Sequence, residues 1–245
     1  MFGKVFAKLP DREVYQTSTI SALMDAVYDG DVTIGELLRH GDFGLGTFNR
    51  LDGEMLVLDG VCYHLRADGT AGVADDRDRT PFAAVSRFVP DLAVQVGSPV
   101  DREGLTALID DSLSSENLIY GIRVTGTFGR IRTRTVREQR PPYPPLAEAA
   151  DEQQESEFSE VTGTLAGYRM PDYEQGIAVA GYHLHFIDEA REFGGHALEL
   201  RLDRGEVEVC VESELHLSLP RTAQFLDADL TNGDSAAAIR RVEGG

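Results

Sequence analysis

A proline-rich break near the middle of the chain limits which regular elements the polypeptide can form. Residues 140–145 read Arg-Pro-Pro-Tyr-Pro-Pro, and proline lacks the backbone N–H that extends a helix or a central strand. The stretch that follows, residues 148–160, holds six carboxylates and no lysine or arginine. A solvated segment is the ordinary interpretation of such a charge run, and an acidic binding site is the less favoured one. We therefore expect an exposed linker over residues 141–160.

Short helices are predicted in the part before this linker. Apolar residues at helical spacing begin at Ile20, directly after Thr19, whose hydroxyl can cap a helix. A second helix is predicted after Thr33, where Glu36 three residues later completes a capping box. Residues 98–113 contain a third amphipathic segment.

The remainder of this first part has the pattern of β-strands. Residues 44–73 consist of short β-branched and aromatic runs interrupted by glycine, and the pairs Asp59-Gly60 and Asp68-Gly69 favour tight hairpin turns. This pattern predicts an antiparallel meander. Two further strands are predicted over residues 118–124 and 128–136, separated at Gly126.

A second strand-rich part follows the linker, with a turn expected at Arg204-Gly205. We therefore predict an α/β fold of the α+β type, with mixed and largely antiparallel sheets and few helices. An N-terminal lobe is expected over residues 1–140 and a C-terminal β-rich lobe over residues 161–245. The strands predicted in the C-terminal lobe are residues 161–168, 177–187, 197–202, 206–212 and 215–217.

The charge of the chain excludes some partners. Asp and Glu total 42 against 23 Lys and Arg, a net charge of -19, which repels nucleic-acid phosphates and anionic lipids. No apolar run reaches the roughly 18 residues that a membrane helix requires, and the first ten residues lack the pattern of a secretory signal. Cys62 and Cys210 are expected to be buried reduced thiols. We expect a cytoplasmic protein with no nucleic-acid or membrane partner.

Three histidines grouped near the C-terminal end form the clearest candidate metal site. His183 and His185 alternate with Tyr182 and Leu184, so in a strand both imidazoles point to the same face. A loop with a Gly-Gly return leads to His196. If the two strands pair antiparallel, His196 comes close to His185. Three imidazoles with an open fourth position are typical of a catalytic zinc site, and structural strand histidines are the alternative.

The first part carries polar residues that are unremarkable when taken singly. Glu54 opens an apolar strand, Thr47 is an ordinary strand residue, and arginines alternate at 130, 132 and 134. An exposed strand start and a solvated sheet face are the favoured interpretations from pattern alone. An arginine of such a row could also enter a cleft and bind a carboxylate.

Together these segments resemble the acetolactate decarboxylase family. The matching motifs include GTFNRLDGE, GTFGRIRTRTV and GYHLHFIDEAREFGGH, and their order and spacing agree over nearly the whole chain. The resemblance implies a zinc lyase and homodimer, with two mixed sheets and the metal between the two lobes. Its zinc ligands would fall on His183, His185 and His196.

The resemblance also implies the remaining site residues and the reaction. Its active-site glutamate, arginine and threonine fall on Glu54, Arg134 and Thr47, and a further glutamate falls on Glu243. The substrate would be 2-acetolactate, converted to acetoin and carbon dioxide through a metal-stabilised enediolate that is protonated on one face. Glu54 or Glu243 would deliver that proton.

Two other functions remain open on the residues alone. Another three-histidine zinc enzyme, such as a hydratase, would use the same ligands. A non-enzymatic β-rich binding module would keep the histidines for structural purposes. Neither alternative requires Glu54 and Arg134 near the histidines, so the position of these two side chains distinguishes the decarboxylase from both alternatives.

Overall fold

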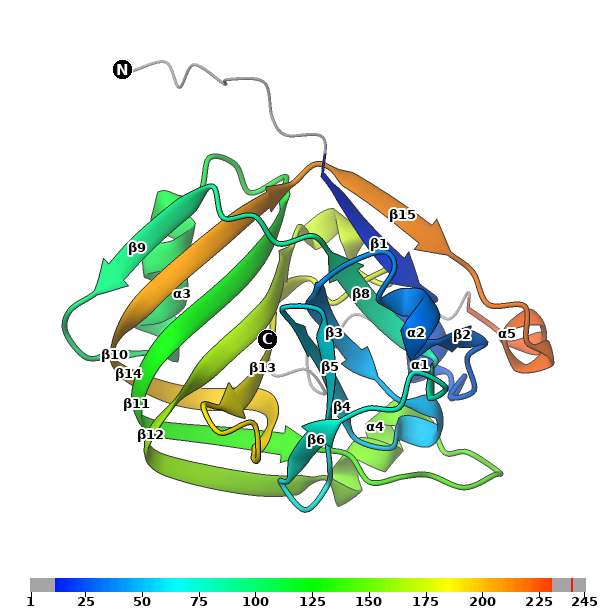
Figure 1. Ribbon diagram of the computed structural model, residues 1–245. Helices are drawn as coiled ribbons and strands as arrows, with labels where there is room; N and C mark the ends of the chain where they lie inside the picture. The colour runs from blue at the N-terminus through cyan, green and yellow to red at the C-terminus, as the bar shows by residue number, and fades with distance from the viewer. Residues whose placement is uncertain (1–11, 231–238, 240–245) are drawn as a thin grey trace.

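Two β-sheets packed against each other form the body of the protein. The computed structural model describes residues 12–230 and 239 (Figure 1). The first sheet has seven strands in the order β15-β1-β8-β3-β4-β5-β6. Its strands are β1 (Glu13–Thr17), β3 (Phe43–Thr47), β4 (Glu54–Leu58), β5 (Val61–Leu65), β6 (Ala71–Val73), β8 (Phe82–Ser86) and β15 (Glu214–Ser218).

The second sheet contains longer, strongly curved strands. Its order is β10-β14-β11-β12-β13, with β9 on β14, and β13 also pairs with β14. The strands β11 to β14 therefore form a closed ring in which each pairs with two neighbours, which removes free edges. The six strands are β9 (Leu92–Val96), β10 (Val100–Asp101), β11 (Ile119–Thr135), β12 (Gln154–Met170), β13 (Gly181–Asp188) and β14 (Gly194–Glu212).

Short helices and one small sheet surround these two layers. The helices are α1 (Ile20–Met24), α2 (Ile34–Leu37), α3 (Arg102–Ser112), α4 (Leu146–Ala149) and α5 (Ala223–Asp227), and β2 (Val32–Thr33) pairs with β7 (Arg79–Thr80). Three 3₁₀ turns cover Asn49–Leu51, Ala150–Glu152 and Asp172–Glu174. No helix within the described ranges is long and apolar enough to cross a bilayer.

The predicted fold class is confirmed, as are the first helices and their caps. Thr19 accepts a hydrogen bond from the Ala22 amide at the start of α1. Thr33 and Glu36 form the reciprocal capping box of α2. Nearly all strand pairs are antiparallel, and the parallel pair of β1 and β15 makes the first sheet mixed.

An apolar layer between the sheets positions the site. Leu45 and Leu56 from the first sheet meet Ala166, Tyr168 and Ile187 from the second in one buried cluster. Burying side chains of this size contributes roughly 1.5–3 kcal/mol for each large aliphatic residue. The two inward faces are thereby held in contact, and side chains from either sheet can meet in this layer.

The strand break expected at Gly126 and the turn expected at Arg204-Gly205 are continuous strand instead. Gly126 lies within β11 and Gly205 within β14, and the two residues are register partners. A Cβ on Gly126 would lie 2.3 Å from the Arg204 carbonyl oxygen. These glycines mark a close approach of two backbones rather than chain reversals.

The second part of the linker expected over the acidic stretch is a strand, and most of its residues are exposed as expected. Residues 154–160 belong to β12, and residues 154–159 pair with the end of β11. Glu155 and Glu157 form ion pairs with Arg132 at 3.1 Å and Arg130 at 2.7 Å. Cross-strand pairing of opposite charges thus makes this charge run compatible with a strand. Each of the two large sheets contains strands from both sides of the proline-rich segment.

Candidate metal centre and active site

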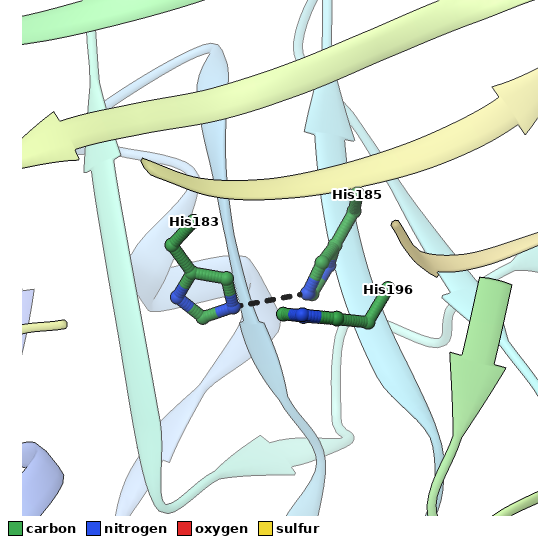
Figure 2. A group of neighbouring side chains, drawn as sticks. All are labelled: His183, His185 and His196. Carbon is green, nitrogen blue, oxygen red and sulfur yellow. Dashed lines mark hydrogen bonds between the residues drawn. The ribbon is translucent and has the colours of Figure 1, made fainter. Parts of the chain in front are cut away.

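Three imidazoles converge on one point between the sheets. His183 and His185 project from the same face of β13, and His185 is the register partner of His196 on β14. The expected antiparallel pairing after the Gly-Gly return is therefore confirmed. His183 Nε2 and His185 Nε2 are 3.2 Å apart, and one ligand atom from each of the three residues lies within 4.8 Å of the others. Figure 2 shows the three rings turned toward one another.

The cluster is closed to solvent. The exposed fractions of His183, His185 and His196 are 7%, 0% and 1%. Burial, with smaller effects of the Arg134 and Arg102 charges, lowers the pKa of His183 to about 3. This imidazole is therefore neutral at physiological pH, and a neutral ring has the lone pair that a metal ion needs.

The donor set fits a tetrahedral metal ion. Two nitrogens bound to such an ion at about 2.0–2.1 Å lie about 3.3 Å apart, close to the separation of the two Nε2 atoms. His185 Nδ1 lies 2.8 Å from the Met55 carbonyl oxygen. A carbonyl only accepts, so Nδ1 carries the proton and the lone pair of Nε2 is directed toward the cluster. The first sheet thus orients His185.

Glu54 reaches the cluster from the other sheet. It is the first residue of β4, its Oε2 is 3.7 Å from His185 Nε2, and it is only 9% exposed. The next residue supplies the carbonyl that holds His185, so the start of β4 both orients a ligand and brings in a carboxylate. The interpretation of Glu54 as an exposed strand start is wrong.

Arg134 completes the charged part of the site. It is the register partner of His196 and only 2% exposed, and its Nη1 lies 3.8 Å from Glu54 Oε1. Arg130 and Arg132 of the same strand instead form ion pairs with glutamates nearer the surface. A register shift between Arg132 and Thr133 falls at this point, and such irregularities re-aim side chains at sites.

Thr47 stands beside Glu54 but its hydroxyl proton is already used. The two residues are register partners on β3 and β4. Thr47 Oγ1 donates to the Gly53 carbonyl oxygen at 2.7 Å. The bond closes the turn that leads into Glu54, so Thr47 supports the position of the carboxylate.

The other candidate residues lie elsewhere. Glu243 is outside the described residues. His64 stacks on Phe48 at a centroid distance of 4.2 Å, His40 stacks on Tyr15 at 3.7 Å, and His216 lies 3.6 Å from Glu13. None of these three belongs to the metal-ligating cluster within the described part of the chain.

One polar residue of the inter-sheet layer gave no signal in the sequence. Gln16 on β1 is fully buried and lines a small cavity that also touches His183. A single glutamine within a strand pattern is usually a surface residue. Only the pairing of β1 with β8 brings this side chain to the inward face.

Comparison with known proteins places the chain in a family. The family model for alpha-acetolactate decarboxylase matches residues 14–232. An alpha-acetolactate decarboxylase of Methylococcus capsulatus is 48% identical over 227 residues, covering 93% of this chain and 87% of the relative. The Bacillus subtilis protein of the same name is 44% identical over 96% of this chain and 92% of its own length.

The three-dimensional likeness is equally extensive. The crystal structure of alpha-acetolactate decarboxylase from Bacillus subtilis strain 168 superposes with a TM-score of 0.93, covering 95% of this chain and 100% of that chain at 44% identity. Matches of this length and identity leave no large part of the fold unaccounted for. The chain belongs to the alpha-acetolactate decarboxylase family.

Proposed function

We propose that this protein is a metal-dependent carboxy-lyase that converts 2-acetolactate to acetoin and carbon dioxide. The observation that carries the proposal is the approach of Glu54, from one sheet, to the three-imidazole cluster of the other. A structural histidine cluster would not require a buried carboxylate and guanidinium at its side. The family relationship supports the same activity.

The chemistry of the substrate defines what the site must supply. Acetolactate is a β-keto acid whose carboxylate leaves as carbon dioxide when its C–C bond breaks. The bonding electron pair moves toward the ketone oxygen and produces an enediolate, which takes up one proton to give acetoin. Negative charge develops on oxygen, so the site must offer fixed positive charge in a dry environment.

His183, His185 and His196 would hold the cation, which we propose to be zinc. When bound there, a divalent cation supplies Lewis acidity that stabilises negative charge on the substrate oxygens. The buried walls formed by the inter-sheet layer exclude water, which strengthens such electrostatic effects.

Arg134 and Glu54 perform the remaining steps. The Arg134 guanidinium is buried and planar, so it can donate two hydrogen bonds to substrate oxygens and fix their orientation. Glu54, in its protonated form at that moment of the cycle, delivers the proton to one face of the enediolate. Thr47 keeps the turn before Glu54 in place through its bond to Gly53. We further propose that the enzyme acts as a homodimer in the cytoplasm.

A combined metal and product analysis tests the proposal. Purified protein should contain close to one zinc ion per chain and form acetoin from acetolactate, with the activity lost after chelation and restored by zinc. A hydratase would turn over carbon dioxide and leave acetolactate unchanged. A binding module would contain no stoichiometric metal and form no acetoin. Either of these results would overturn the proposal.

A further inference from the structure

A small apolar cavity adjoins the three-histidine cluster. It is lined by His183, by Gln16, and by apolar side chains that include Leu45, Met170 and Val179. Its volume is about 10 Å³, which is close to the smallest volume that holds one water molecule. The cavity is therefore small, and its lining is largely apolar.

Gln16 is the side chain in this lining whose hydrogen bonding is incomplete. Its Nε2 donates to the Ser18 carbonyl oxygen at 2.9 Å and to the Ile177 carbonyl oxygen at 2.8 Å. Two carbonyl acceptors fix which end of the amide carries nitrogen. Its Oε1 is buried and accepts no hydrogen bond from any described residue. A buried polar atom left in this state calls for a partner beyond the described residues.

The position of Gln16 in the first sheet places it on the face that carries the site. Gln16 pairs with Ala84, which in turn pairs with Leu45. Thr47 lies two residues after Leu45 on β3, and its register partner on β4 is Glu54. Alternate residues of a strand point to the same face, so Thr47 and Glu54 share the inward face with Gln16. The carboxamide oxygen thus faces the same inter-sheet layer as the glutamate.

We propose that Gln16 Oε1 accepts a hydrogen bond from the hydroxyl of the substrate, while the cavity beside it receives the neighbouring methyl group. The inference rests on the proposed function and adds a specificity-determining residue to it. The acetolactate anion has a single hydrogen-bond donor, which is its hydroxyl. An amide oxygen only accepts, so no other group of this substrate can satisfy it.

This arrangement selects α-hydroxy β-keto acids over β-keto acids that lack the hydroxyl. A site whose buried acceptor is paired by a substrate hydroxyl rejects the analogue without it, because the acceptor is then left unpaired. The small apolar cavity adds a second, steric preference for a methyl group over a longer alkyl chain at this position of the substrate.

Binding of two stable analogues tests the proposal without turnover. The zinc-loaded protein is titrated calorimetrically with 2,3-dihydroxy-2-methylbutanoate and with 3-hydroxy-2-methylbutanoate, which differ only in the hydroxyl at C2. The Gln16→Met and Gln16→Glu variants are compared. Both lose the amide donors to Ser18 and Ile177, but only Gln16→Glu keeps an acceptor oxygen. We expect the preference for the dihydroxy compound to fall at least tenfold in Gln16→Met and to persist in Gln16→Glu.

Controls separate this role from a structural one. Gln175→Leu, which removes another carboxamide from the segment that Gln16 contacts, should leave the preference unchanged. An equal loss of preference in both Gln16 variants, or an unchanged preference in Gln16→Met, would overturn the proposal. A crystal structure of the wild-type protein with the dihydroxy analogue gives the same test without any substitution. The C2 hydroxyl should lie within about 3.2 Å of Gln16 Oε1, and a hydroxyl placed elsewhere would refute the assignment.

Failure of this inference can be distinguished from failure of the proposed function. If the wild-type protein forms no acetoin, the proposed function fails. If it forms acetoin but the two analogues bind equally well to the wild-type protein and to Gln16→Met, only the role of Gln16 fails.

Discussion

Glu54 Oε1 lies 3.8 Å from Arg134 Nη1, although the two residues belong to different sheets and are 80 positions apart in the chain (134 minus 54). Their side chains are only 11% and 2% exposed. Burying two opposite charges is costly unless each is stabilised by its surroundings. Their meeting beside the imidazole cluster therefore indicates a functional rather than a purely structural arrangement, as the proposed function requires.

The first prediction concerns the proton donor. Gln in place of Glu54 keeps the shape of the side chain but removes its acidic proton. We expect Glu54→Gln to bind metal like the wild-type protein and to lower kcat by two or more orders of magnitude, in the range of lost general acid catalysis. Metal content and acetoin formation are measured on the same preparation.

Glu157→Gln provides the matched control for this experiment. Glu157 pairs with Arg130 near the surface at 2.7 Å, so its substitution should leave turnover near the wild-type value. Wild-type turnover in Glu54→Gln would remove Glu54 from the proposed role.

The second prediction concerns Arg134. Arg134→Met removes the guanidinium while keeping an unbranched apolar stem of similar length. We expect kcat/KM for acetolactate to fall at least a hundredfold, corresponding to about 3 kcal/mol of lost transition-state stabilisation. Steady-state kinetics at saturating metal provide the measurement.

Arg132→Met, on the same strand, shows whether any effect is specific. Arg132 forms ion pairs with Glu155 and Glu199, and exposed pairs contribute about 1 kcal/mol at most. Equal losses of kcat/KM in both variants would indicate a general effect on β11 rather than a contact with substrate.

The histidine cluster shows how far sequence periodicity reaches. Alternation in β13 places His183 and His185 on one face, and the Gly-Gly return brings His196 opposite His185. Both follow from local rules of strand geometry, so the three-histidine cluster is predictable from residues 181–196. Glu54 and Arg134 could be added only through the family resemblance, because their proximity depends on how two sheets pack.

The expectations that the structure contradicts failed for the same reason, since they also depend on how distant segments pack. Gly126 and Gly205 have the composition of turns, yet they face each other across two long strands. Their role depends on a backbone approach between distant segments that no local pattern encodes. The sequence around Glu155 and Glu157 is typical of a loop, and it forms a strand because arginines of β11 lie opposite these glutamates. Gln16 is similarly undetectable until the pairing of β1 with β8 turns it inward.

The third prediction concerns the metal ligands. Removing one of three imidazoles leaves too few donors to hold the ion, so metal and activity should fall together in His183→Ala. His216→Ala, which alters a histidine beside Glu13 on the first sheet, should retain both. Metal content is determined by elemental analysis after dialysis. Stoichiometric metal in His183→Ala would refute its assignment as a ligand.

The fourth prediction concerns a buried acid that the reaction does not use. Glu212 at the end of β14 is fully buried, and burial raises its pKa to about 7. Hydrogen bonds from Ser86 and Cys210 and the charge of Arg12 oppose this effect only in part. The unfolded chain has the ordinary pKa of 4.5. Between these two values the folded protein therefore binds a proton that the unfolded chain does not.

The sign of the pH dependence follows from this difference. The stabilising contribution is fully present below pH 4.5 and is lost as the pH rises through about 7. Glu212→Gln stays neutral at every pH, so it should match the wild-type protein near pH 4 and exceed its stability near pH 8. The pKa difference limits the gain to about 3 kcal/mol. Urea unfolding of the metal-loaded proteins at both pH values measures it. Glu214→Gln, an exposed neighbour on β15, should show the same difference from the wild-type protein at both pH values. A Glu212→Gln variant whose stability relative to wild type does not change with pH would show that Glu212 is ionised in the folded protein throughout this range.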